Sequence, residues 1–296
     1  MLRKVFQALG RTIQIGGIAM EEIISSLVNR ATESIHACAE DYVKDGLLYC
    51  GKCNTPKQGE YRMPWGIIKP YILCQCATMK REREEQEVKA RELYERIHRN
   101  RREGFTDKTM RSWTFEADDR VNEKISTLAH RYVDNFPDMR KTGKGLLLFG
   151  DVGVGKSFIA ACIVNALIDK GYPCMMTNFS RLVNTLQGRF EGRQEYIDSL
   201  NRYTMLAIDD LGVERDTQAV NEIVYSVIDA RGRAGLPLIV TTNLSSQELK
   251  HPRNKHEERI FSRLMGMCVP VEVTGCDRRK ERLKEDFGEL KDLLGL

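Results

Sequence analysis

Gly145-Leu-Leu-Leu-Phe-Gly-Asp-Val-Gly-Val-Gly-Lys-Ser157 is the stretch of the sequence that decides the fold. Its first five residues form an apolar run typical of a buried strand, and its last eight fit the pattern G-x-x-x-x-G-K-[S/T] in full. Glycines allow such a loop to curl so that its backbone N–H groups point at phosphate oxygens, and the helix that follows adds its positive N-terminus. The stretch therefore predicts a strand, a phosphate-binding loop and a helix, in that order.

The loop also predicts which residues contact a nucleotide. Lys156 is expected to reach the β- and γ-phosphates, and the hydroxyl of Ser157 is expected to ligate Mg²⁺. A glycine-rich turn without a ligand is the alternative, but the strand before the loop and the helix after it favour phosphate binding. The predicted nucleotide-binding residues are Gly150, Asp151, Val152, Gly153, Val154, Gly155, Lys156, Ser157 and Phe158.

From Thr114 onward, short apolar runs alternate with helical patterns. Strands are predicted at 145–149, 174–176, 205–208 and 238–241. Helices are predicted near 117–135, 158–170, 179–188 and 217–233, with Ser180 as a candidate N-cap of the third. Such alternation is typical of a doubly wound parallel sheet. The predicted fold class is therefore α/β, a parallel sheet flanked by helices.

Two acidic residues, Asp209 and Asp210, follow the apolar run Leu206-Ala-Ile208. An acidic residue at the carboxyl end of a strand beside a phosphate-binding loop can hold Mg²⁺. Asp209 is predicted to do this together with Ser157, and Asp210 is predicted to polarise the attacking water. Because acidic residues are common at strand ends, this prediction depends on the phosphate-binding loop.

Two further segments carry side chains suited to phosphoryl transfer. Asn243 follows an apolar strand and two threonines, where it would place a neutral amide near the γ-phosphate; a turn asparagine is the alternative. Arg259 and Arg263 are four residues apart on one predicted helix face. An arginine from a neighbouring subunit often stabilises the charge that builds on the γ-phosphate, and a surface arginine pair is the alternative.

The order of these motifs resembles the AAA+ ATPases. More narrowly, about residues 110 to 283 look like the DnaC/DnaI helicase loaders and their IstB relatives in transposition, which are similar to the initiator DnaA. The resemblance implies an AAA+ domain with Asn243 as sensor 1, Arg263 as an arginine finger acting in trans, and Arg259 as its helper.

The sequence departs from this family pattern at two places. Gly275-Cys-Asp-Arg-Arg279 stands where the family has Gly-x-Ser-x-Arg, which implies Arg279 as sensor 2, with Arg278 as the alternative. Asp209-Asp210 stands where the family usually has Asp-Glu. A shorter carboxylate reaches the attacking water less well, so we expect ATP hydrolysis to be slow and to be stimulated by DNA or a partner.

Cys50-Gly-Lys-Cys53 and Cys74-Gln-Cys76 are two close cysteine pairs. Such pairs can close a tetrahedral four-cysteine zinc site, which would be structural because no ligand position stays open for catalysis. Redox pairs or chance clustering are the alternatives. The DnaI type of loader carries such a zinc module, and the resemblance implies that the N-terminal domain grips the replicative helicase.

The rest of the chain predicts its domain organisation. Residues 1–19 are interpreted as a translated leader that is not native, with Met20 as the natural start. One or two amphipathic helices are expected over 20–45, within an N-terminal module at 20–77 that is zinc-ribbon-like. A charged helical connector follows at 78–110, helical over 79–104, and the AAA+ domain at 111–296. A nucleic-acid-binding arm is the alternative for the connector.

Composition narrows the class of protein. The net charge of +4 permits contact with nucleic acid without arguing for it. The sequence contains no run of eighteen apolar residues, which predicts no membrane span. Nine cysteines, an odd number, argue against a secreted disulfide framework and indicate a reducing compartment, the cytoplasm.

The predicted function is that of an ATP-dependent loader, which uses ATP, Mg²⁺ and structural Zn²⁺. We expect it to bind the replicative hexameric helicase, to form an ATP-dependent homo-oligomer and to deliver the helicase to single-stranded DNA. Arg189-Phe190 are a candidate DNA contact. Two alternatives stay open: an IstB-type transposition helper that acts on double-stranded DNA, and a non-hydrolysing nucleotide switch that serves as an adaptor.

Overall fold

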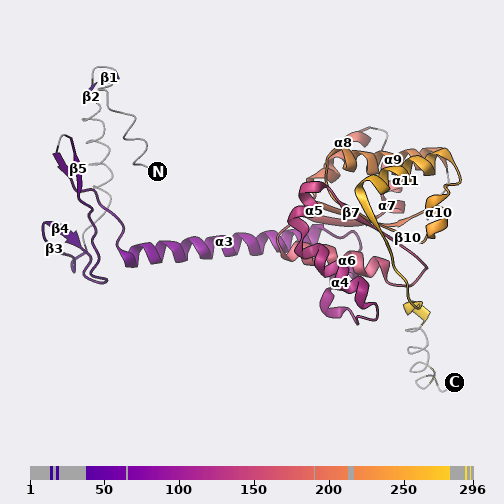
Figure 1. Cartoon of the computed structure of the whole chain (residues 1–296), viewed down its shortest axis with the longest axis horizontal. Coiled ribbons are helices and arrows are strands. Elements are labelled where there is room, and N and C mark those ends of the chain that lie inside the picture. Colours follow the sequence, from indigo (N-terminus) through magenta and orange to yellow (C-terminus); the bar gives the residue numbers. More distant parts are fainter. Residues whose placement is uncertain are drawn as a thin grey trace. The chain divides into compact units, whose positions relative to one another are not determined.

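The computed structural model describes residues 14–15, 18–19, 38–64, 66–189, 191–212, 217–280, 291 and 294. The chain divides into two compact units, Met1–Arg91 and Glu92–Leu296, and each is described by itself (Figure 1). The predicted leader at 1–19 and the predicted helix over 20–37 lie outside the described residues, apart from one short antiparallel pair, β1 (Gln14–Ile15) and β2 (Ile18–Ala19).

The N-terminal unit contains two short antiparallel hairpins. β3 (Tyr42–Lys44) pairs with β4 (Leu47–Tyr49), and β5 (Tyr61–Met63) pairs with β6 (Gly66–Ile68). Asp45 and Gly46 connect the first pair with positive φ angles of 52° and 73°, which a tight Asp-Gly hairpin turn requires. The helix predicted over 20–45 is therefore wrong for its last residues, because the Asp-Gly pair turns the chain back into a hairpin.

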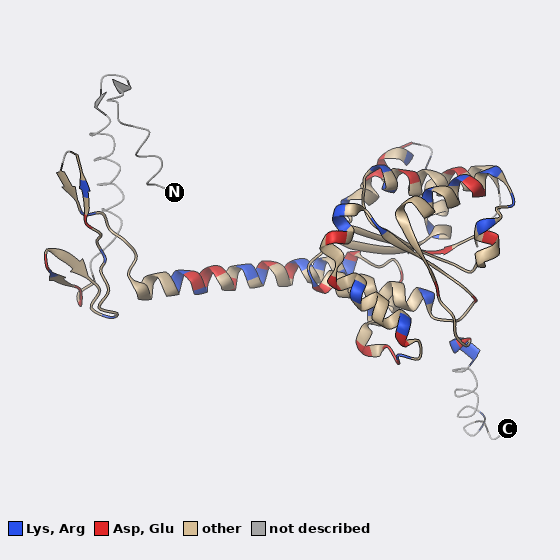
Figure 2. Cartoon of the chain, viewed as in Figure 1, with Lys and Arg blue, Asp and Glu red and all other residues tan. Residues whose placement is uncertain are grey.

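A charged helix, α3 (Gln75–Glu103), follows in the chain and has no buried side chain. Acidic and basic residues alternate along it (Figure 2). Arg81 pairs with Glu85 at 2.9 Å and Arg83 pairs with Glu87 at 3.0 Å, both one helical turn apart. Such i,i+4 pairs support a helix that has little apolar surface to bury. The charged region predicted to be helical over 79–104 is helical in the structure.

The C-terminal unit is built on a five-stranded sheet in the order β11-β7-β10-β9-β8. All four strand pairings are parallel. Because the paired strands are parallel, each strand is connected to the next one in the chain by a segment that contains a helix, as in doubly wound α/β folds. This confirms the predicted fold class. The strands are β7 (Gly145–Phe149), β8 (Cys174–Asn178), β9 (Met205–Leu211), β10 (Leu238–Thr242) and β11 (Cys268–Glu272).

Helices cover both faces of the sheet, and the sheet separates two apolar cores (Figure 1). Leu146 and Leu148 of β7 pack in the core of α4 and α6, whereas Leu147 and Phe149 pack in the core of α7, α9 and α11. The alternation follows from the two-residue period of a strand. The helices are α4 (Glu123–Asp134), α5 (Phe136–Thr142), α6 (Lys156–Asp169), α7 (Phe179–Gln187), α8 (Arg193–Ser199), α9 (Gln218–Arg233), α10 (Ser246–Lys250) and α11 (Lys255–Met267), with short 3₁₀ helices η1 (Lys108–Ser112), η2 (Phe115–Ala117) and η3 (Leu200–Arg202).

Two predicted helix starts differ from the structure. The helix predicted near 117–135 begins only at α4, where the side chain of Asn122 accepts the backbone N–H of Ile125 as an N-cap. The N-cap of α7 is Asn178 rather than Ser180, because the Asn178 side chain accepts the backbone N–H of Arg181 at 2.8 Å. In both cases an asparagine supplies the acceptor that the first turn of a helix lacks.

Arg231, near the end of α9, is buried with 1% of its surface exposed. Its Nη1 donates to the Tyr203 carbonyl at 2.8 Å, its Nη2 to the Thr204 carbonyl at 2.9 Å, and its Nε to the Pro237 carbonyl at 3.1 Å. These carbonyls lie just before β9 and β10. The Arg231 guanidinium therefore connects the backbone at the start of β9, which carries the acidic residues, to the backbone at the start of β10, which precedes Asn243.

Replacing Arg231 by methionine is expected to lower the free energy of unfolding by about 2–3 kcal/mol. Methionine fills much of the space but leaves the three carbonyls without their donor. Urea unfolding of the full chain measures the change. The matched control is Arg140→Met in α5, an exposed arginine, which should change stability by less than about 0.5 kcal/mol. Equal losses in the two variants would contradict this role of Arg231.

Candidate nucleotide-binding site and metal centre

The phosphate-binding loop connects β7 to α6. Gly153 and Gly155 have φ angles of 84° and 97°, which side-chain-bearing residues rarely adopt. A Cβ on Gly153 would also lie 2.0 Å from Oδ1 of Asp277, so this position requires glycine for space as well. The predicted sequence of strand, loop and helix is therefore formed, with Lys156 and Ser157 in the first turn of α6.

Lys156 lies inside this loop with 5% of its surface exposed. Its Nζ donates to the carbonyls of Gly150 at 2.8 Å and of Asp151 at 2.5 Å. Burial lowers the pKa of Lys156, and the nearby carboxylates of Asp210 and Asp209 oppose that change. The loop thus holds an ammonium group at the centre of the predicted phosphate site, with acidic residues close enough to act on its charge.

Ser157 and Asp209 come together from α6 and β9. The Asp209 carboxylate is 5% exposed, and it accepts hydrogen bonds from the hydroxyls of Thr241, at 2.5 Å, and of Ser157. Burial raises the pKa of Asp209, whereas these two hydrogen bonds lower it. A serine hydroxyl beside a carboxylate oxygen offers the hard oxygen ligands that Mg²⁺ prefers, so this pair fits the magnesium site predicted for it.

Asp210 occupies an irregular position in β9. Its φ is 58°, in the left-handed region, and the register between β9 and β10 shifts at this point. Its backbone N–H donates to Oγ1 of Thr241 at 3.0 Å. Bulges of this kind redirect a side chain and are frequent beside active sites. Thr241 therefore positions both acidic residues, a role that the sequence prediction missed because it assigned the Thr-Thr-Asn segment to Asn243 alone.

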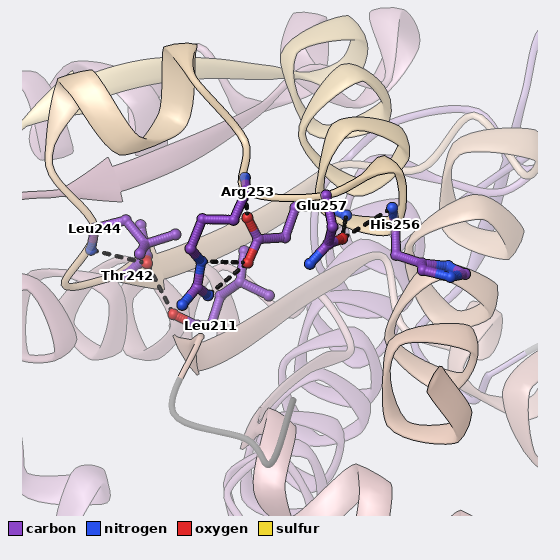
Figure 3. A network of polar contacts seen from close by, with 7 residues as sticks. Leu211, Thr242, Leu244, Arg253, His256 and Glu257 are labelled. Atoms are coloured by element: carbon purple, nitrogen blue, oxygen red, sulfur yellow. Dashed lines mark hydrogen bonds and ion pairs between the residues drawn. The ribbon is translucent and has the colours of Figure 1, made fainter. Parts of the chain in front are cut away.

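Asn243 is exposed and follows directly on β10, which lies between β7 and β9 in the sheet. It therefore leaves the sheet between the phosphate-loop strand and the acidic strand. Thr242, just before it, donates to the Leu211 carbonyl at 2.8 Å and accepts from the Leu244 N–H at 3.2 Å (Figure 3). These contacts fix the backbone on both sides of Asn243.

The segment after β11 runs against the phosphate-binding loop. The backbone N–H of Arg278 donates to the Gly153 carbonyl at 3.1 Å, and its side chain pairs with Asp119 at 3.1 Å. Arg279 is exposed, and its charge is one of the influences that lower the pKa of Lys156. The structure therefore brings Arg279 near the predicted phosphate site and gives Arg278 a separate partner, Asp119, which the sequence prediction did not include.

Arg259 and Arg263 both lie on α11, as the four-residue spacing predicts. The guanidinium of Arg259 lies 4.4 Å from the ring centroid of Tyr225, and Arg263 forms an ion pair with Asp229. Both partners belong to α9. Because α9 and α11 cover the sheet face opposite α6, these contacts do not place the two arginines at the phosphate-binding loop of their own chain.

The start of α11 is fixed by its own hydrogen bonds (Figure 3). Oδ1 of Asn254 accepts the backbone N–H groups of His256 and Glu257 at 3.0 and 2.9 Å. The Glu257 carboxylate in turn accepts the backbone N–H of Arg253 at 2.8 Å and its Nε at 2.9 Å. These hydrogen bonds fix the residue at which α11, the helix that carries both arginines, begins.

Four cysteines of the N-terminal unit converge as predicted. The Sγ atoms of Cys50, Cys53, Cys74 and Cys76 all lie within 4.8 Å of one another. Cys76 Sγ lies 3.6 Å from that of Cys50 and 3.4 Å from that of Cys74. A tetrahedron with Zn–S bonds of about 2.3 Å has S···S edges of about 3.8 Å, so the cluster fits a zinc ion.

The surroundings of the cluster lower the pKa of two of its thiols, Cys53 and Cys50, and raise the pKa of a third, Cys76. The hydroxyl of Thr55, 3.0 Å from the Cys53 sulfur, is the main cause that lowers the pKa of Cys53 to about 5. The backbone N–H of Cys53 is the main cause that lowers the pKa of Cys50. The neighbouring sulfurs, Cys74 first, raise the pKa of Cys76 to about 12. Four such crowded sulfurs can all be thiolates once a dication neutralises them, which is the chemistry of a structural zinc site.

Fold and loop together define a P-loop ATP-binding protein of the AAA+ class. Residues 78–285 match the sequence profile of the family described as IstB-like ATP binding protein, and the chain belongs to that family. Within the part of the chain that the structure describes, no helix combines the length and the apolar character needed to cross a membrane.

The relatives that the chain matches include proteins named as helicase loaders and proteins named as insertion sequence ATP-binding proteins. The chain is 32% identical over 149 residues to the replicative helicase loader DnaI of Bacillus subtilis (strain 168), which covers 46% of this chain and 48% of that protein. It is 34% identical over 148 residues to an insertion sequence ATP-binding protein of Sinorhizobium fredii (strain NBRC 101917 / NGR234), covering 47% of this chain and 48% of that protein. The chain thus spans about half the length of the curated relatives it matches.

The fold has a counterpart among solved structures. A crystal structure described as that of DnaI superposes with a TM-score of 0.50 and 23% sequence identity, covering 61% of this chain and 99% of that chain. The likeness shows that 61% of this chain shares the fold of that structure. The predicted family resemblance to helicase loaders and IstB proteins is therefore confirmed.

Proposed function

We propose that this protein is an ATP-dependent loader that binds the replicative hexameric helicase and delivers it to single-stranded DNA. The observation that carries the proposal is the four-cysteine cluster in a unit distinct from the ATP-binding unit. Because the cluster lies in a unit separate from the ATP-binding unit, that unit can bind a partner protein while the other unit binds ATP. Homology to the loader DnaI supports the same reading. The nine cysteines, all among the described residues and none in a disulfide, agree with work in a reducing cytoplasm.

ATP hydrolysis is assigned to the side chains that meet at the sheet edge. Lys156 contacts the β- and γ-phosphates, and Ser157 and Asp209 hold Mg²⁺, which neutralises charge on the phosphate oxygens. Asp210 polarises the attacking water, and Asn243 orients it. The exposed Arg279 contacts the γ-phosphate from the same chain. The short Asp210 carboxylate makes turnover slow until the site is completed by assembly.

Completion of the site is assigned to a second copy of the chain. Arg263, assisted by Arg259, contacts the γ-phosphate held by the neighbouring subunit, so that ATP drives homo-oligomer formation. Single-stranded DNA is bound by this oligomer through backbone charge and stacking. Of the proposed contact pair Arg189-Phe190, Phe190 lies outside the described residues, and the guanidinium of Arg189 lies 4.8 Å from the ring centroid of Tyr196.

A transposition helper that acts on double-stranded DNA is the second candidate. The relative from Sinorhizobium fredii supports it, because its name places it with insertion sequences. The four-cysteine cluster favours the loader, since the resemblance to the DnaI type of loader implies a zinc module of this kind.

ATP turnover by the full chain is expected to rise at least about tenfold when single-stranded DNA and the replicative helicase of the same organism are both present. A duplex of equal length, tested in parallel, should stimulate less. Asp210→Asn should abolish turnover while helicase capture and ATP binding stay unchanged. Stimulation by duplex DNA without any effect of helicase would support the transposition helper. Tight ATP binding without turnover in any mixture would instead support a nucleotide-switch adaptor.

A further inference from the structure

A cationic groove of about 490 Å³ lies between α9 and α11. Lys255, Arg259 and Arg263 line it at four-residue intervals on one face of α11, with Tyr225 of α9 opposite and Glu258 as its carboxylate. Three cations against one carboxylate give the groove the charge that a phosphate group requires. The two arginines are nevertheless held differently inside it.

Arg259 rests on an uncharged partner. Its guanidinium lies 4.4 Å from the centroid of the Tyr225 ring, a cation–π contact that leaves its N–H edges able to bond an anion. Arg263 is instead held by a carboxylate, that of Asp229, which raises the pKa of Arg263 above its ordinary value. An arginine bound to a carboxylate cannot offer the same N–H groups to a phosphate, so only Arg263 has to change partners to act.

The carboxylate that holds Arg263 has a second cation. Asp229 is 9% exposed at its side chain, and Arg233, one turn further along α9, pairs with its Oδ2 at 3.0 Å while Arg263 pairs with Oδ1. Both arginines are accessible, because 66% of the Arg233 side chain and 44% of the Arg263 side chain are exposed. A buried carboxylate without a partner is strongly unfavourable, but Asp229 keeps one when Arg263 leaves.

We infer that Asp229 and Arg233 are positioning residues that control whether Arg263, the proposed arginine finger, is free to contact phosphate. Asp229 holds Arg263 away from phosphate in the separate chain, and Arg233 stays on Asp229 when Arg263 turns to the nucleotide of a neighbouring copy. Asp229 therefore competes with the nucleotide for Arg263, and Arg233 weakens that competition. This inference rests on the proposed role of Arg263 in trans and names the residues that regulate it.

The two residues have opposite expected effects. Asp229→Asn keeps the size and one acceptor but removes the charge, so Arg263 is released more easily. Arg233→Gln leaves Arg263 as the sole cation on a buried carboxylate, so Arg263 is released less easily. The quantity that reports release is the protein concentration at which ATP turnover is half-maximal, measured on the full chain with saturating ATP, Mg²⁺ and single-stranded DNA.

Asp229→Asn is expected to lower this half-maximal concentration by about five- to tenfold, and Arg233→Gln to raise it by about fivefold. In the Asp229→Asn background, Arg233→Gln should have no further effect, because Arg233 acts only through the charge of Asp229. Turnover at saturating protein should stay within about twofold in all three variants. The matched control is Asp134→Asn, which removes the exposed pair with Lys170 at 3.0 Å and should move neither quantity.

A purely structural role of Asp229 would lower the urea midpoint and saturating turnover without moving the half-maximal concentration, and this result would overturn the inference. Additive effects of the two substitutions would overturn it as well. Arg263→Ala separates this failure from failure of the proposed function. If Arg263→Ala removes concentration-dependent turnover while Asp229→Asn has no effect, the role of Arg263 in trans is supported and the inferred role of Asp229 is wrong. If Arg263→Ala has no effect, the role of Arg263 in trans is itself wrong.

Discussion

A chain in which Lys156 is replaced by alanine is expected to bind ATP and Mg²⁺ at least about 1000-fold more weakly than the unmodified chain, a loss of about 4 kcal/mol. The lost group is an ammonium with 5% surface exposure, surrounded by loop carbonyls and facing the predicted triphosphate position. Charge-assisted hydrogen bonds in such a buried place are stronger than exposed ones. Titration with a fluorescent ATP analogue measures the change.

Lys170 supplies the matched control because it lies at the opposite end of the same helix, where its Nζ donates to the Val133 carbonyl at 3.1 Å. Lys170→Ala should leave nucleotide affinity within about twofold, since the residue is far along α6 from the loop. Capture of the helicase should survive Lys156→Ala, because the four-cysteine cluster belongs to the other unit. Loss of both activities in Lys156→Ala would mean that the two units do not work separately.

Features set by short-range patterns could be predicted from the sequence. The run at 145–149 forms β7 as expected. Its side chains are apolar on both faces of the strand, so both faces are buried, as in a central strand of a parallel sheet. The convergence of Ser157 and Asp209 was also predictable, since the carboxyl ends of parallel strands meet at one sheet edge. The cysteine spacing in the same way predicted the cluster of four sulfurs.

Contacts that depend on distant register could not be predicted. The left-handed backbone of Asp210 arises from the shift between β9 and β10, and a strand pattern does not contain its partner's alignment. The double role of Thr241 follows from the same shift. The pairing of Asp229 with Arg263 joins residues on two different helices, and only their packing brings them together. Each of these contacts connects segments that are remote in the sequence.

The four-cysteine cluster is expected to depend on zinc for its fold. Among the described residues of 38–74, only Cys50, Lys57 and Cys74 are buried, so this region has almost no apolar core. Its hairpins have strands of three residues each, which are too short to be stable alone. Structural zinc contributes folding free energy on the order of 10 kcal/mol, which is enough to replace the missing core.

Cys76→Ser should therefore reduce bound zinc from about one ion per chain to nearly none, and residues 38–74 should lose protection from amide hydrogen exchange. Elemental analysis of the full chain and hydrogen exchange with mass spectrometry give the two readouts. The matched control is Cys38→Ser, an exposed thiol of the same unit outside the cluster, which should keep both zinc and protection. The exchange of β7 and α6 should be unchanged in both variants, because the phosphate-binding loop lies in the unit with its own core. Full protection of 38–74 in metal-free protein would instead show that Asp41, which pairs with Lys57 at 2.5 Å, and the backbone hydrogen bonds hold this unit without zinc.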